Sequence, residues 1–262
     1  MKIFLGTIAL EVNRWSSRVP SFSVCDWIDK IRNDGFDGIE LWENHLLMHE
    51  KPEEEAKRIL ASGFPVEVYN SYIGFENSAA SHRDTAVKMI KLLKAPAVKY
   101  NVGSDLNKLV EYKDNLIKFA SDLPESCRLL CELHDGTVLE DDAVAMEFFN
   151  DLPKGKFDLI LQPFGSLDVF KKKFEIFGDR ITNIHSQLSD DNDKRIGLEQ
   201  KKNTVCECFA VMKDYDFDGD ITIEFTEGTA SPGENIDDLY KNTVLDMQFI
   251  RDHYIKNYVV NL

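Results

Sequence analysis

Short apolar segments rich in β-branched and aromatic residues alternate with amphipathic segments along the whole chain, and this alternation restricts the fold more than any other feature. Eight such pairs can be counted. The expected strands cover 2–9, 37–43, 65–73, 97–103, 127–134, 157–164, 181–188 and 220–225. The expected helices cover 23–35, 52–63, 81–95, 105–123, 139–152, 166–179, 203–216 and 235–257. Alternating strands and helices of this length are typical of parallel βα units.

Eight βα units in 262 residues match the size of one closed (β/α)₈ barrel, an α/β fold. An open, doubly wound sheet is the alternative, and it usually has a glycine-rich turn after its first strand. The turn here reads TIALEVNRW and contains no GxGxxG motif. Since no linker or low-complexity segment interrupts the pattern, we predict a single TIM-barrel domain over 1–262.

The charge of the chain excludes several classes of partner. With 31 basic and 46 acidic residues, the net charge is −15, which repels nucleic-acid phosphates and anionic lipid surfaces. No apolar run reaches the ~18 residues that a membrane span needs, and the first residues lack a signal-peptide pattern. We therefore expect a cytoplasmic protein that binds neither nucleic acid nor membranes. Its five cysteines include no paired CxxC motifs and are expected to be reduced thiols.

Polar residues at the C-terminal ends of barrel strands are the first candidates for chemistry. Glu132, His185 and Glu224 each follow or interrupt an apolar strand, and Gln162 ends another. A buried ionisable group is costly without a partner or a metal, although any one of them alone could be a satisfied structural group. Carboxylate, imidazole and amide groups together suit Mn²⁺ or Zn²⁺, with Mg²⁺ less favoured. We predict that these four residues hold one divalent ion.

Four segments carry a resemblance to a known family. They are FDGIELWEN at 36–44, CELHDG at 131–136, NIHSQL at 183–188 and DGDITIEF at 218–225. In order and spacing the chain resembles, over nearly its whole length, the sugar phosphate isomerase/epimerase group of xylose-isomerase-like TIM barrels. The resemblance implies a divalent metal held by Glu, Asp, His and Glu, with both glutamates also moving protons at neighbouring substrate carbons. Glu132, His185 and Glu224 match three of these positions.

The chain departs from the family pattern at three places. Gln162 stands where the family has an aspartate, and Gly165 stands where it has a substrate-binding histidine. Leu188 replaces an aspartate that follows the strand-seven histidine. Arg195 lies in the next long loop, where the family often places a substrate arginine. Because Gln162 replaces an aspartate, the expected ligand set carries one negative charge fewer than that of the family.

The same family includes the AP endonucleases, which use three zinc ions and many histidines. Here strands three and four end in Tyr69, Asn70 and Asn101 instead of histidine. Together with the net charge of −15, this argues against a nuclease.

The sequence favours a metal-dependent isomerase or epimerase of a small carbohydrate or related hydroxy-carbonyl compound. Glu132 and Glu224 are the expected proton carriers. Glu40, His134 and Arg195 are the expected substrate contacts, although Glu40 could equally hydrogen-bond neighbouring barrel residues and His134 could instead support a neighbouring site residue. A metal-assisted lyase or dehydratase begins with the same proton abstraction and remains an alternative. A non-catalytic sugar-binding barrel is the other alternative, but such a barrel would have no physical need for both glutamates.

Overall fold

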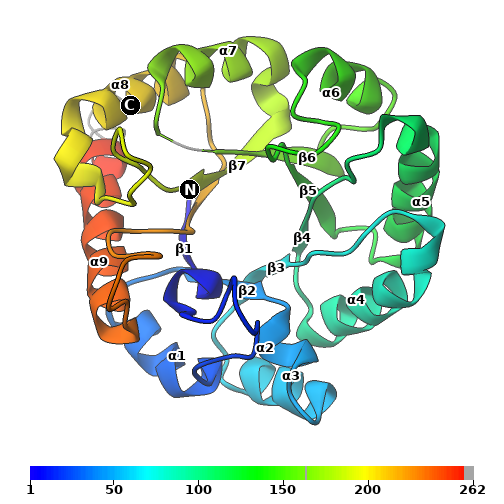
Figure 1. Ribbon diagram of the computed structural model, residues 1–262, viewed down its shortest axis with the longest axis horizontal. Coiled ribbons are helices and arrows are strands. Elements are labelled where there is room, and N and C mark those ends of the chain that lie inside the picture. The colour runs from blue at the N-terminus through cyan, green and yellow to red at the C-terminus, as the bar shows by residue number, and fades with distance from the viewer. Residues whose placement is uncertain (163, 257–262) are drawn as a thin grey trace.

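The computed structural model describes residues 1–162 and 164–256 and contains a closed parallel barrel of eight strands in chain order. Figure 1 shows this ring of strands at the centre, surrounded by helices. The strands are β1 (Ile3–Gly6), β2 (Gly38–Trp42), β3 (Val66–Asn70), β4 (Ala97–Tyr100), β5 (Arg128–Glu132), β6 (Phe157–Leu161), β7 (Ile181–Ser186) and β8 (Asp220–Ile223). β1 pairs with both β2 and β8, which closes the barrel. The predicted (β/α)₈ TIM-barrel fold is confirmed.

A helix follows each strand on the outside of the barrel. These helices are α1 (Val24–Asn33), α3 (Pro52–Ala61), α4 (Ala80–Leu93), α5 (Leu109–Asp122), α6 (Asp142–Phe149), α7 (Leu167–Phe177), α8 (Lys202–Asp214) and α9 (Ile236–Ile250). A short helix that was not expected, α2 (Asn44–Leu47), precedes α3. Residue 163, which lies within the expected strand 157–164, and residue 257, which ends the expected helix 235–257, lie outside the described residues.

Several strands end earlier than the sequence suggests. The segment expected as strand 2–9 leaves the sheet after Gly6 and forms a 3₁₀ turn at Thr7–Leu10, where the Thr7 hydroxyl accepts a hydrogen bond from the Trp42 backbone N–H. The expected strand 127–134 likewise stops at Glu132. Periodicity does not distinguish a strand residue from an apolar residue in the loop directly after it. These early ends leave loop residues at the rim of the barrel.

The barrel interior has an apolar floor. Five buried side chains, one from each of five strands, form a separate cluster inside the barrel: Phe4, Val68, Ala97, Leu130 and Ile160. Successive strand residues point to opposite sides, so residues two positions further along β4 and β5 also face inward. Those residues are Lys99 and Glu132, both buried. The interior therefore changes from apolar to charged toward the C-terminal ends of the strands.

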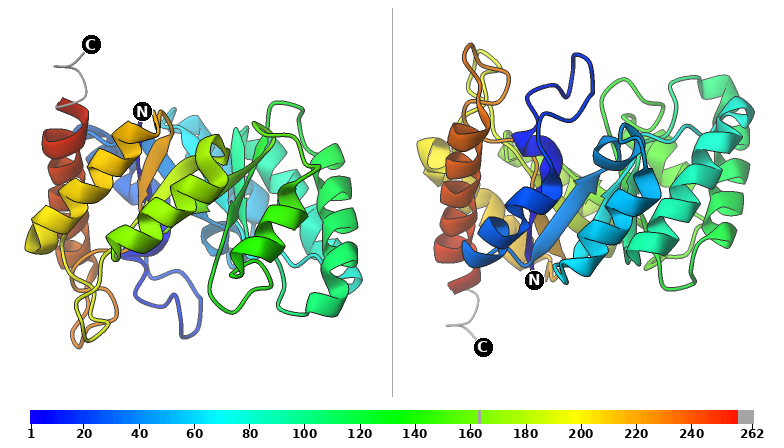
Figure 2. Two further views of the ribbon diagram at one scale, coloured as in Figure 1. Left: turned by 90° about the horizontal axis from the view of Figure 1, so that it is seen from above. Right: turned by 90° about the horizontal axis from the view of Figure 1, so that it is seen from below.

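Long loops extend from one end of the barrel. In Figure 2 the blue loop after β1 and the yellow and orange loops after β7 and β8 project from the same end, away from the N-terminus. The loops thus surround the charged end of the barrel interior.

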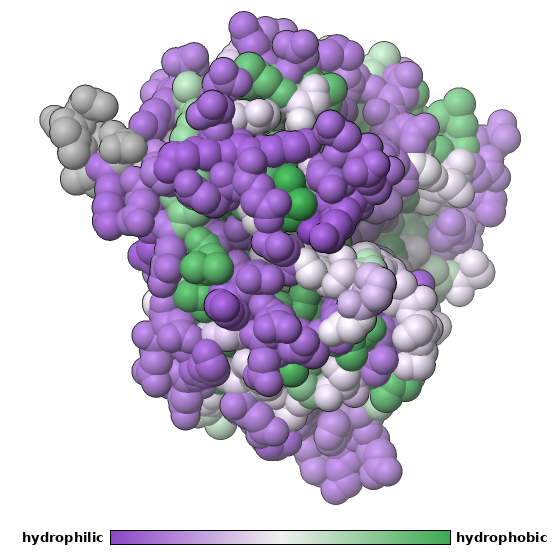
Figure 3. Space-filling view, turned by 60° about the vertical axis from the view of Figure 1, so that its left-hand side comes forward, coloured by the Kyte–Doolittle hydropathy of each residue, from purple (hydrophilic) through white to green (hydrophobic). Residues whose placement is uncertain are grey.

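Hydrophilic residues dominate the face shown in Figure 3, with apolar residues in small separate groups. Among the described helices, none combines the length and apolar character needed to cross a membrane.

Gly6 is required by the close approach of β1 and β8. A Cβ atom on Gly6 would lie 2.9 Å from the Ile223 carbonyl oxygen and 3.3 Å from Thr222 Cγ2. We expect Gly6→Ala to lower the free energy of unfolding by about 1–3 kcal/mol, measured by chemical denaturation, because the packed backbone must move. Gly197 is the control, since its φ of −73° is close to the −70° of Gly6 but its nearest contact would be 3.5 Å. Equal effects of the two alanines would contradict this packing argument.

Candidate metal centre

His185 is the centre of a buried cluster of carboxylates. Its Nδ1 lies 3.1 Å from Glu132 Oε1 and 3.2 Å from Glu224 Oε2. Its Nε2 lies 3.1 Å from Glu40 Oε2. Burial acts to lower the pKa of His185, but the carboxylates of Glu224 and Glu40 outweigh it and hold the pKa well above its usual range. The cluster thus concentrates negative charge around one imidazole ring.

Glu40 fixes the orientation of that ring from behind. Asn70 donates a hydrogen bond of 2.6 Å to Glu40 Oε1, and the Thr222 hydroxyl donates one of 3.0 Å to Glu40 Oε2. When the ring gives up its second proton to a metal ion, a carboxylate at Nε2 favours a hydrogen on that nitrogen and leaves the lone pair on Nδ1. Nδ1 is the nitrogen that faces Glu132 and Glu224.

Glu132 is held by both of its oxygens. Oε2 accepts hydrogen bonds from the Lys99 ammonium at 2.7 Å and from Asn101 Nδ2 at 3.0 Å. Oε1 faces His185 Nδ1 and accepts from Gln162 Nε2. Burial favours the protonated form, but Lys99 and His185 lower the pKa of Glu132 well below its usual range. Glu132 is therefore an ionised group with one oxygen directed at the centre of the cluster.

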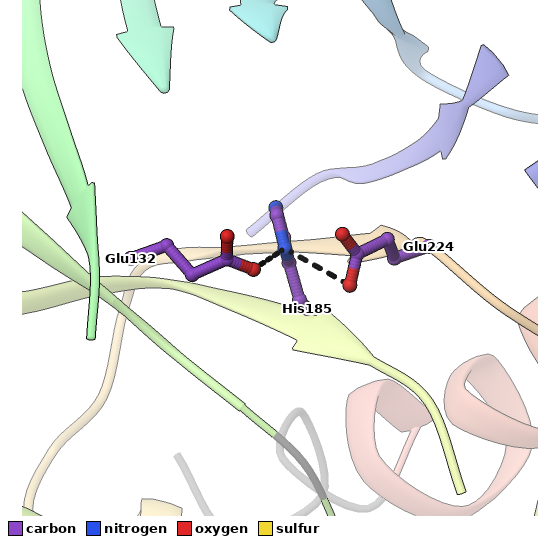
Figure 4. A group of neighbouring side chains, drawn as sticks. All are labelled: Glu132, His185 and Glu224. Carbon is purple, nitrogen blue, oxygen red and sulfur yellow. Dashed lines mark hydrogen bonds and ion pairs between the residues drawn. The ribbon is translucent and has the colours of Figure 1, made fainter. Parts of the chain in front are cut away.

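Glu224 approaches the ring from the other side. Gln187 Nε2 donates a hydrogen bond of 3.1 Å to its Oε2, and Gln162 Nε2 lies 3.5 Å from the same oxygen. Figure 4 shows Glu132 and Glu224 pointing toward each other with the edge of the His185 ring between them. The structure therefore brings all four predicted metal ligands together, Gln162 included.

The donor set fits a divalent metal ion. One ligand atom each from Glu132, His185 and Glu224 lies within 4.8 Å of the other two, and all three residues are buried. Two carboxylate oxygens and an imidazole nitrogen are typical ligands of zinc and manganese. Rotation of the Gln162 amide by half a turn would direct its oxygen at the same point. These residues would hold the ion, and Glu40 would orient the histidine.

Lys99 was not among the candidates from the sequence, and Gln187 was noted beside His185 at a strand end but was given no role. Lys99 lies in AVKY, where it reads as the polar member of an alternating strand. The signal that could have revealed it is the period of two, which places Lys99 on the same side of β4 as Ala97 and Asn101. Gln187 follows His185 at the same interval.

A cavity of about 860 Å³ opens above the cluster. Glu132, Gln162, Gln187 and Glu224 contribute to its lining. Aromatic and basic side chains line it as well: Arg14, Trp15, Arg18, Trp42, Tyr72, Lys173, Arg195 and Phe225. Its size and mixed lining suit a small polar ligand.

The predicted substrate contacts have different positions. His134 lies past the end of β5 and, although exposed, lines the cavity. Arg195 also lines the cavity, with its guanidinium 5.4 Å from the Phe225 ring centre and hydrogen-bonded to Ser189. Glu40 is fully buried, does not line the cavity, and has both oxygens occupied by protein donors. Its position corrects the expected substrate contact, because it reaches only His185 and its other protein partners.

Comparison with known proteins gives matches to solved structures. No protein-family model and no curated protein matches the chain. The probable 3-DHS dehydratase AsbF from Bacillus anthracis matches with a TM-score of 0.68 at 15% identity, over 95% of this chain and 98% of that one. The IolI protein with a bound zinc atom matches with a TM-score of 0.65 at 16% identity, over 97% and 99%. The chain has the fold of the xylose-isomerase-like TIM barrels.

The same fold includes a nuclease. Endonuclease IV from Thermus thermophilus matches with a TM-score of 0.62 at 13% identity, over 96% of this chain and 100% of that one. The xylose-isomerase-like fold therefore does not itself argue against nucleic acid, and that expectation rests on the charge and on the end residues of β3 and β4. At such identities the likeness establishes the fold, and activity must be argued from the site.

Glu40 should contribute to metal affinity through His185. We expect Glu40→Gln to weaken Zn²⁺ binding about 10–100-fold, because a neutral amide holds and polarises the imidazole less well. Competition with a zinc-binding dye measures this. Glu55→Gln is the matched control, since Glu55 is a buried carboxylate that pairs with Arg58 on α3. Unchanged Zn²⁺ affinity in Glu40→Gln would show that Glu40 does not support the metal site.

Gln162 should limit metal affinity through its lack of charge. We expect Gln162→Asp to bind Mn²⁺ and Zn²⁺ more tightly than the wild type, because a carboxylate supplies a negative charge that the amide lacks. Calorimetric titration of both proteins measures the difference. Weaker binding by the aspartate variant would show that Gln162 is not a ligand or has another role.

Proposed function

We propose that this protein is a metal-dependent isomerase or epimerase of a small carbohydrate or related hydroxy-carbonyl compound. The observation that carries the proposal is the placement of Glu132 and Glu224 on opposite sides of His185, at the base of a cavity. Removal of a proton alone would need only one carboxylate as general base. Two carboxylates flanking one ligand position support removal of a proton from one carbon and its return at the next.

The proposed ion is Mn²⁺ or Zn²⁺, held by Glu132, His185, Glu224 and Gln162. Such an ion would supply polarisation of a substrate carbonyl, which would make the neighbouring C–H more acidic. The zinc atom in the IolI structure is consistent with this assignment. The ligand atoms of this chain, rather than that likeness, are the main support.

Protein residues would transfer the protons, hold the two glutamates and contact the substrate. One glutamate removes the proton next to the carbonyl and the other returns a proton at the neighbouring carbon. Lys99 and Asn101 hold Glu132 from below, while Gln187 holds Glu224. Arg195 and His134 line the cavity and are the proposed contacts for substrate hydroxyl or anionic groups. The Trp15 and Phe225 rings, 5.4 Å apart, also line it.

A lyase remains the alternative because it starts with the same step. A dehydratase would remove the proton and then expel water from the adjacent carbon, and AsbF has this fold. The product distinguishes the two reactions: an isomerase conserves the mass of its substrate, whereas a dehydratase loses one water. A screen of ketoses, inososes and keto-glycosides in deuterated solvent, read by NMR and mass spectrometry, therefore tests both.

Each glutamate should be needed for turnover. We expect Glu132→Gln and Glu224→Gln to lower turnover by about 10²-fold or more, because each loses the basic oxygen that carries the proton. The diagnostic measurement is exchange of the substrate α-hydrogen with deuterated solvent.

Glu140→Gln is the matched control for this pair, since Glu140 also lines the cavity but lies exposed at its rim. It should retain the wild-type exchange rate. If both Glu132→Gln and Glu224→Gln also exchange at that rate, neither glutamate is the base. A screen that finds no substrate for metal-loaded wild type would favour a sugar-binding barrel.

A further inference from the structure

Lys99 lies inside the barrel as a buried cation that transfers no proton in the proposed reaction. Its side chain is 2% exposed, and Tyr72 lies over it with the ring centre 4.6 Å from Nζ. Nζ contacts Glu132 Oε2 at 2.7 Å and Asn101 Oδ1 at 2.8 Å. Lys99 does not line the cavity, so it has no direct access to a substrate. Its role must act through Glu132.

The charges around His185 do not balance without a further cation. Three carboxylates contact the ring, from Glu40, Glu132 and Glu224. Lys99 supplies one positive charge and a protonated His185 supplies a second, which leaves one negative charge. When a metal ion takes the Nδ1 lone pair the ring is neutral, and two negative charges remain for the ion to balance. Buried charges of one sign are costly, and one divalent ion would neutralise the remainder.

Hydrogen bonding to Glu132 does not explain the lysine, because Asn101 donates to the same oxygen at 3.0 Å. What Lys99 alone adds is charge. A fixed ammonium beside a ligand carboxylate stabilises that carboxylate when no metal is bound, and it repels a metal ion that binds to the other oxygen. Both effects act through Glu132, whose Oε1 faces the ligand position while Oε2 faces Lys99.

We propose that Lys99 is a resident cation of the metal centre, a positioning residue that keeps Glu132 in place without metal and thereby weakens the binding of a divalent ion. This inference rests on the metal site of the proposed function. It adds that the site is assembled before the ion arrives and that the affinity for the ion is set partly by a lysine. A cluster that lacked Lys99 would depend on the metal for its stability.

The test replaces the ammonium and measures metal binding and unfolding. Lys99→Met should bind Zn²⁺ at least about tenfold more tightly than the wild type by dye competition, because one repelling charge is removed. In excess EDTA its Tm should fall by about 5 °C or more, and added Zn²⁺ should restore it. The wild-type Tm should change less between the same two conditions.

Two further variants separate charge from hydrogen bonding. Lys99→Gln can still donate hydrogen bonds but carries no charge, so its Zn²⁺ affinity should rise as in Lys99→Met. Lys156→Met is the control for loss of a lysine, because Lys156 Nζ donates to the carbonyls of Pro124, Glu125 and Cys127, before β5 begins and at the far end of the barrel. Its Zn²⁺ affinity should remain that of the wild type.

The outcomes are distinct. Neutral variants that fold only with Zn²⁺ would be the strongest support. Unchanged or weaker Zn²⁺ binding in both neutral variants would overturn the proposal, and so would variants that stay unfolded with Zn²⁺ present, since the ion then fails to replace the lysine. None of these measurements is of turnover. If the protein had no isomerase activity but the neutral variants bound Zn²⁺ more tightly, the proposed function would be refuted and this inference would stand.

Discussion

The burial of three carboxylates around one imidazole is the interaction on which the rest of the site depends. Isolated in an apolar interior, Glu40, Glu132 and Glu224 would each be too costly to keep ionised. His185 contacts all three, and Lys99 contacts one of them. The amides of Asn70, Asn101, Gln162 and Gln187 then supply hydrogen bonds to the same carboxylates. The polar end of the barrel is therefore one connected network.

The fold was predictable because it follows from a periodicity that repeats along the whole chain. Eight alternations of strand and helix leave few topologies in 262 residues, and handedness and strand order follow from the closed parallel barrel. What failed were the strand ends, at Gly6 and Glu132, since the apolar residues that follow belong to rim loops that pack against the barrel. Packing of loops depends on the assembled structure and leaves no local period.

The candidate site also contains residues that could be predicted from the sequence and residues that could not. Glu132, His185 and Glu224 were predicted to converge because strand ends in a barrel meet, and the structure brings them together. Glu40 was expected to contact substrate, because its position in β2 does not show that the His185 ring contacts its carboxylate. Lys99 was missed because a lysine in a strand is usually exposed, and only the cross-strand distance to Glu132 reveals its partner. Side-chain pairs between strands are properties of the closed barrel.

The apolar floor formed by Phe4, Val68, Ala97, Leu130 and Ile160 gives the described barrel interior a closed end. A cavity that is closed at one end has one entrance, so under the proposed function a product would leave by the route through which the next substrate enters. Substrate and product would bind in the same cavity in turn, and initial-rate measurements would then show competitive product inhibition. The floor also separates Glu132, which is buried, from the solvent at the other end of the barrel.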